Sequence, residues 1–147
     1  MPQVDEGAST GAVFSTINIG GVDYRLAVFE EDGQLVVTEG GVFRRLLVAG
    51  GASGGGTDGN YAGGGGGAGG GVDDDEQEIA AGTYPVTVGE GGAVAGNSES
   101  GNDGEASAIV GVASVPGGGG GGIGLGGLGA QGGQRAGGAQ SFKGASA

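Results

Sequence analysis

Short runs of apolar and β-branched residues, separated by glycines, mark the first third of the chain. Gly20-Gly21 and Asp32-Gly33 divide the first three runs in the way that tight turns divide the strands of a hairpin. The runs are 12–19 (AVFSTINI), 22–29 (VDYRLAVF), 34–38 (QLVVT) and 42–49 (VFRRLLVA). We therefore predict a meander of about four short strands over residues 12–49, used for assembly or anchoring, after a flexible arm at residues 1–11.

From residue 50 onward, glycine blocks alternate with short apolar pieces, of which Tyr84–Val88 and Ser107–Val115 are the most strand-like. No stretch keeps a helical period before a glycine interrupts it. We predict a glycine-rich domain over residues 50–138, followed by a C-terminal tail at 139–147.

The glycine blocks allow two structures. A flexible linker is one, although linkers normally lack apolar residues, whereas these blocks contain Ile123, Leu125 and Leu128. The other is an ordered extended helix of the polyproline II type, with three residues per turn, packed against others like it. The pattern does not decide between them, nor between such helices and strands padded with glycine.

Composition bears on the oligomeric state, because 44 of the 147 residues are glycine. Each glycine loses much backbone freedom on folding and buries no side chain, so one protomer has little apolar surface to offset the ordering entropy. We therefore expect a homo-oligomer, with a trimer as the first guess. The expected fold class is all-β: a short-strand meander joined to a glycine-rich module of β or polyglycine II-like type, with almost no helix.

Charge and missing residue types exclude several functions. Five Lys or Arg face seventeen Asp or Glu, giving a formal net charge of −12, which disfavours nucleic-acid binding. The chain has no histidine or cysteine, so a serine nucleophile lacks its usual base and a zinc site lacks its usual ligands. We expect no enzyme activity and no cofactor. No signal peptide is visible, and no apolar run is long enough to span a bilayer, so we expect no membrane insertion.

Two motifs suggest a cofactor site or a metal site, but each has a better explanation. Residues 124–129 match GxGxxG, but the match lies in a glycine tract without the strand and helix that a dinucleotide site requires. The acidic residues 73–76 offer oxygen ligands for calcium, but the spacing of an EF-hand is missing. A solvated acidic loop is favoured, and no metal site is predicted.

Candidate contact residues lie in turn-forming stretches and in one strand. The first group offers polar or aromatic side chains to a partner or receptor, although these residue types also simply supply positive φ for turns. Its members are Asp58, Asn60, Tyr61, Asn97, Asn102 and Asp103. Arg44 and Arg45 form the second group: strand alternation sends one to each face, and the less exposed one needs a carboxylate partner, for which a subunit contact is a candidate.

The order of the blocks resembles a known family. An apolar strand runs into glycines at 46–51, a glycine run with an embedded alanine follows at 63–71, and the phrase AGTYPVTVGEGG occupies 81–92. A polar loop and a second glycine run at 117–122 complete the order. Over roughly residues 42–138, the chain resembles the glycine-rich domain of tail-fibre and adhesin proteins of tailed phages.

This resemblance implies a structural protein of a virus particle, made in the host cytoplasm and assembled onto the virion. Its expected partners are other capsid or tail proteins, and a small fibre, spike or decoration component fits the length. One alternative is an adhesin tip that binds a bacterial surface receptor through its loops. The other is a largely disordered glycine-rich secreted or matrix protein.

Overall fold

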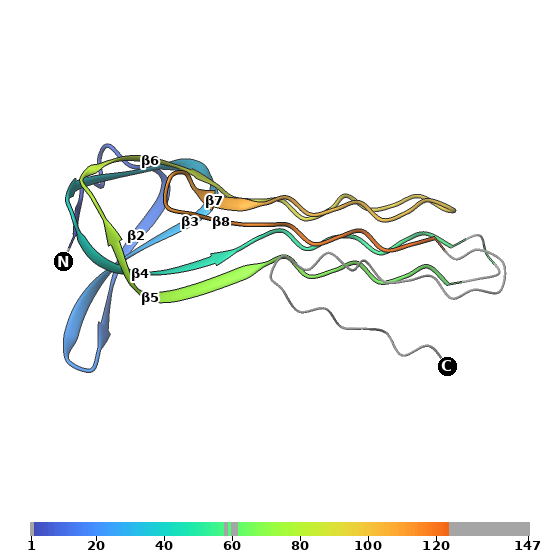
Figure 1. Ribbon diagram of the computed structural model, residues 1–147, viewed down its shortest axis with the longest axis horizontal. Coiled ribbons are helices and arrows are strands. Elements are labelled where there is room, and N and C mark those ends of the chain that lie inside the picture. Colours follow the sequence, from blue (N-terminus) through green and yellow to red (C-terminus); the bar gives the residue numbers. More distant parts are fainter. Residues whose placement is uncertain (1, 58, 60–61, 124–147) are drawn as a thin grey trace. The chain divides into compact units, whose positions relative to one another are not determined.

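A computed structural model describes residues 2–57, 59 and 62–123 (Figure 1). The chain divides into two compact units whose segments alternate along the sequence. The strand unit comprises Met1–Leu47, Val72–Val88 and Ser107–Ser114, and the glycine bundle comprises Val48–Gly71, Gly89–Ala106 and Val115–Ala147. All described elements are strands, as the all-β prediction requires. Over the described residues there is no helix long and apolar enough to cross a membrane.

A β-hairpin begins the strand unit, as predicted. β2 (Thr10–Ile19) pairs antiparallel with β3 (Val22–Glu39), and Ile19 faces Val22 across the turn. Both turn residues have positive φ, 61° at Gly20 and 86° at Gly21, which glycine adopts without strain. Asn18 reinforces the turn, because its side-chain oxygen accepts a hydrogen bond from the Gly21 N–H.

β3 continues straight through Asp32-Gly33, so the turn predicted there is wrong. At this point β3 exchanges partners: its first half pairs with β2, and Gly33–Val37 pair with β6 (Gly82–Thr87). Gly33 permits the exchange because its backbone lies against Thr10, where a Cβ atom would be 2.1 Å from the carbonyl oxygen. The glycine therefore serves a close approach of two strands rather than a turn.

The predicted flexible arm also contains ordered structure. β1 (Gln3–Val4) pairs with the end of β3, opposite Glu39 and Val37. The Asp5 N–H donates to the Val36 carbonyl at 2.9 Å, which extends this attachment. The pairing of Gln3–Val4 with β3 could not be predicted, because the polar sequence around these residues lacks the alternation of a strand.

The remaining strands complete two sheets. In the larger sheet the order is β1-β3-β6-β7-β8, with β2 also on β3. β7 (Ser107–Ile109) and β8 (Ala113–Val115) divide the predicted run 107–115 at a turn. The smaller sheet pairs β4 (Gly41–Val48) with β5 (Gly71–Ile79), so residues 73–76 are a strand and not the predicted acidic loop. The strand unit's buried apolar side chains are Val37, Leu47, Ile79 and Val86.

The glycine bundle consists of extended segments that hydrogen-bond to one another through their backbones (Figure 1). Its described segments are 48–57, 62–71, 89–96, 98–106 and 115–123. Donors recur every third residue, which is the period of a polyproline II helix. From 48–57 to 62–71 the bonds are Ala49 N–H to Gly70 O, Ala52 N–H to Gly67 O and Gly55 N–H to Gly64 O, at 2.8–2.9 Å. The described glycine runs are thus ordered polyglycine II-type helices, which resolves the choice that the sequence left open.

Segment 48–57 forms hydrogen bonds with each of the other four described segments of the bundle. Glycine is needed where a side-chain position points at a neighbouring backbone, as at Gly104, where a Cβ atom would lie 2.1 Å from the Gly50 oxygen. Many side chains point outward instead, and Val94 is 93% exposed, whereas Ala49 and Val115 are buried. The burial in this unit is therefore largely backbone against backbone, with few apolar side chains.

Candidate contact site

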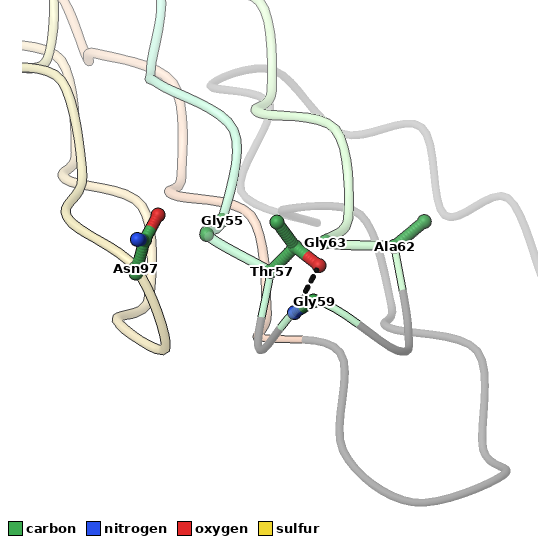
Figure 2. Close-up of a pocket in the computed structure, with 7 residues that line it drawn as sticks. Gly55, Thr57, Gly59, Ala62, Gly63 and Asn97 are labelled. Atoms are coloured by element: carbon green, nitrogen blue, oxygen red, sulfur yellow. Dashed lines mark hydrogen bonds between the residues drawn. The ribbon is translucent and has the colours of Figure 1, made fainter.

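Two turns of the glycine bundle enclose a shallow hollow (Figure 2). It is lined by Gly55, Gly56, Thr57, Gly59, Ala62, Gly63 and Asn97. Thr57 shapes the first turn, because its Oγ1 accepts a hydrogen bond from the Gly59 N–H at 3.0 Å. The second turn is held to the first by the Ser98 N–H, which donates to the Thr57 carbonyl at 3.2 Å.

Asn97 lies at the exposed end of this second turn. Ser98 follows it with φ 59°, a left-handed conformation unusual for a residue other than glycine. Glu99 supports this backbone, because its carboxylate accepts the Gly96 N–H at 3.0 Å. Among the described residues, no hydrogen bond involves the Asn97 side chain. Its amide is therefore presented as a donor and an acceptor on a braced turn.

The other residues predicted as loop contacts are placed differently. Asn102 and Asp103 lie along segment 98–106 and not at a loop tip. The Asn102 side-chain amide donates to the Ala93 carbonyl at 2.9 Å, and Asp103 Oδ1 accepts the Gly120 N–H at 2.7 Å. Both side chains thus connect neighbouring segments of the bundle. Asp58, Asn60 and Tyr61 lie outside the described residues.

Sequence reasoning missed the side chains that hold the bundle together. Ser53 is one of them, since its Oγ accepts the Asn102 N–H at 2.8 Å. Thr57 and Glu99 brace the turns in the same way. Their signal was a lone hydroxyl or carboxylate among glycines, and a pattern of that kind does not reveal which neighbouring segment will be contacted.

Arg44 and Arg45 lie on opposite faces of β4, as alternation predicted. The Arg44 side chain is 63% exposed and that of Arg45 is 11% exposed. Both pair with β5 of the same chain: Arg44 contacts Asp73 at 2.8 Å and Arg45 contacts Asp74 at 2.6 Å. The acidic stretch therefore neutralises two arginines, and among the described residues no acidic cluster is arranged to hold a metal ion.

Arg45 should matter more for stability than Arg44. Its guanidinium also donates to the Val112 carbonyl at 3.3 Å, so Asp74→Ala leaves a largely buried cation without its carboxylate. We expect Asp74→Ala to lower the free energy of unfolding by about 1–3 kcal/mol. Arg44→Ala, which removes exposed ion pairs, should cause a smaller loss. Urea denaturation of both variants tests this, and equal effects would contradict it.

Two exposed carboxylates should titrate at unusually low pH. A hydrogen bond from Arg44 holds the pKa of Asp73 below its ordinary 3.8, and Arg25 likewise holds the pKa of Glu6 below 4.5. Because these pKa values are depressed in the folded protein, the pairs contribute stability above the ordinary pKa and lose it as the pH falls through the folded pKa. Carboxyl NMR titration should give midpoints that return to ordinary values in Arg44→Ala and Arg25→Ala respectively. Unchanged midpoints in those variants would refute the assignment.

One of three comparisons with known proteins found a match. A search of characterised proteins and a search of solved structures each returned no match. The profile of the glycine-rich domain family matches residues 32–147, a span that starts ten residues before the resemblance seen in the sequence. Since this match covers most of the chain, the protein belongs to the glycine-rich domain family.

Proposed function

We propose that this chain is a structural protein of a tailed-phage particle, a small fibre, spike or decoration component of the capsid or tail with a mechanical, non-catalytic role. Its partners would be other virion proteins and further copies of itself, with three-fold assembly as the first expectation. The finer assignment to a phage rests on the resemblance in block order, from the strand running into glycines at 46–51 to the glycine run at 117–122.

The observation that supports a mechanical role is the three-residue period of backbone hydrogen bonds in the glycine bundle. With a rise of about 3.1 Å per residue, segment 48–57 spans about 30 Å. Lateral bonds at each turn of the helix stiffen every segment against its neighbours. A bundle of this kind can hold its end turns at a fixed distance from the point where its segments begin.

Particle association tests this proposal directly. Particles released from the source organism are banded on a density gradient, and the chain is followed by antibody across the fractions. The proposal expects the chain in the particle band at a fixed ratio to the other virion proteins. Chain found only in the particle-free fractions would overturn it and would favour a secreted or matrix protein.

An adhesin tip is the second candidate, and Asn97 is the observation that favours it. A braced turn with a side-chain amide beside the hollow at Thr57 could hydrogen-bond to a polar receptor on a bacterial surface. We expect Asn97→Ala to lower the binding of fluorescent protein to host cells at least about tenfold, because a receptor group would lose its partner. Ala68→Ser, on an exposed position of the bundle, should bind normally. Equal binding of the two variants would remove this candidate.

The disordered-matrix alternative predicts a different behaviour of the backbone. Linker glycines exchange their amide hydrogens at the rate of an unfolded chain, whereas hydrogen-bonded glycines are protected. Hydrogen exchange followed by mass spectrometry should therefore show protection at Gly64, Gly67 and Gly118, whose N–H groups are bonded in the bundle. Fast exchange at all three would favour the matrix protein.

A further inference from the structure

One face of the β2–β3 hairpin is apolar along its whole length. Alternate residues of a strand point to the same face, and residues opposite each other in an antiparallel pair share it. Ile17 faces Tyr24, Ile19 faces Val22 and Val13 faces Val28. The exposed fractions on this face are Val13 65%, Ile17 37%, Ile19 57%, Val22 48%, Tyr24 42%, Leu26 37% and Val28 40%. We call these seven residues the apolar hairpin face.

The opposite face of the hairpin carries the half-buried side chains of Phe14, Ala27 and Phe29, and near the turn it carries polar side chains that have partners within the chain. Asn18 Nδ2 donates to Asp23 at 2.6 Å. Arg25 donates to Thr16 Oγ1 at 2.9 Å and to the Glu6 carboxylate at 2.6 Å. The opposite face is therefore partly buried or paired within the chain, while the apolar hairpin face is left in contact with solvent.

Such an arrangement is unfavourable for an isolated protomer. A two-stranded ribbon is at best marginally stable in water unless a further layer packs on it. The seven exposed fractions correspond to roughly 500–600 Å² of apolar surface, at the upper limit of what a soluble monomer exposes in one patch. With a polar rim, a patch of this size approaches the roughly 800 Å² that each partner buries in a standard interface.

We infer that the apolar hairpin face is the surface through which copies of this chain associate, an inference that rests on the homo-oligomer of the proposed function. Charge favours a second copy as the occupant. Copies that each carry a net charge of −12 repel one another, so they can meet closely only over a neutral surface. The apolar hairpin face carries no charged residue, and Ser15, which faces Leu26, lies on the same side of the hairpin.

Two further features agree with self-association. The face is built from cross-strand pairs of similar shape, so it can pack on an identical face related by symmetry. The hairpin also precedes the match to the glycine-rich domain family, which begins at residue 32. The apolar hairpin face therefore lies outside the residues that carry the family match.

Sedimentation of the full chain tests the inference. We expect a concentration-dependent oligomer whose dissociation constant falls as salt screens the repulsion between copies. Ile17→Thr combined with Tyr24→Thr keeps strand-forming residues while removing the centre of the face, and should weaken association about 100-fold. Val94→Thr is the control, because Val94 is an exposed apolar residue of the glycine bundle that does not belong to the apolar hairpin face. A monomeric wild-type chain, or a double variant that stays oligomeric, would overturn the inference.

Cross-linking keeps the test sharp if the double variant fails to fold. The chain has no cysteine, so Ser15→Cys places a single thiol beside the apolar hairpin face, on the same side of the hairpin, and Thr16→Cys places one on the opposite side. The inference expects a short bis-maleimide to join copies of Ser15→Cys and to leave Thr16→Cys unlinked. Equal linking of both would refute it. Particle association is measured in a separate experiment. A chain that is monomeric in solution but bands with particles would refute the inference and still support the proposed function.

Discussion

Replacing Gly118 by alanine is expected to destabilise the glycine bundle by at least about 3 kcal/mol. The added Cβ atom would lie 2.2 Å from the Gly67 oxygen and 2.7 Å from the Gly67 carbonyl carbon. Both atoms belong to backbone, so no flexible side chain can move aside. The clash also separates the Gly118 N–H from the Gly50 carbonyl, to which it donates at 3.0 Å.

Gly65→Ala is the matched control for this substitution. Gly65 also lies in a glycine run, but a Cβ atom there would have no heavy atom within 4 Å. Alanine at this exposed position should leave the stability unchanged or raise it by about 0.5 kcal/mol, because it restricts the unfolded chain. Thermal unfolding, with hydrogen exchange at the bundle glycines as a second readout, compares the two variants. Equal midpoints would mean that the segments do not pack as described.

Gly33→Ala is expected to have the largest effect in the strand unit, again about 3 kcal/mol or more. The new Cβ atom would lie 2.1 Å from the Thr10 oxygen and 3.0 Å from Gly11 Cα. Relief of this clash requires β2 to move away from β3 at the point where β3 passes to β6. We expect faster hydrogen exchange at Ala12 and Phe29 and a lower midpoint of urea unfolding.

Gly82→Ala supplies the comparison within the same sheet. Gly82 faces Val37 in the β3–β6 pair, and a Cβ atom there would meet only the Tyr84 ring at 3.6 Å, an ordinary contact. Alanine should therefore be tolerated within about 0.5 kcal/mol. A loss at Gly82 as large as the loss at Gly33 would show that glycine is needed in this pair for flexibility and not for close approach.

The features that local sequence determines were predictable. Gly20-Gly21 between two β-branched runs gave the hairpin, and glycine density gave the choice between linkers and polyglycine II-type helices. Alternation placed Arg44 and Arg45 on opposite faces. Each of these depends only on residues near one another in the chain.

Features that depend on distant segments were not predictable. Asp32-Gly33 has the composition of a turn, and only the contact of Gly33 with Thr10 reveals that it continues a strand. Gly65 and Gly118 have neighbours of the same kind, so nothing local distinguishes the exposed glycine from the buried one. Among the candidate contacts, Asn97 and Asn102 both lie in a polar stretch, and only the contacts of Asn102 with the distant Ser53 and with the Ala93 carbonyl show that Asn102 connects segments of the bundle.

The three-residue period of the bundle also sets the step by which the length of its segments can change. Because every third residue meets the same neighbour, adding three glycines to both segments that flank a turn would carry that turn about 9 Å farther. All lateral partners would keep their identity, since one complete turn restores each N–H to its former direction. The length of the bundle can therefore change in steps of one helical turn, and its cross-section stays the same where every segment gains the same three residues.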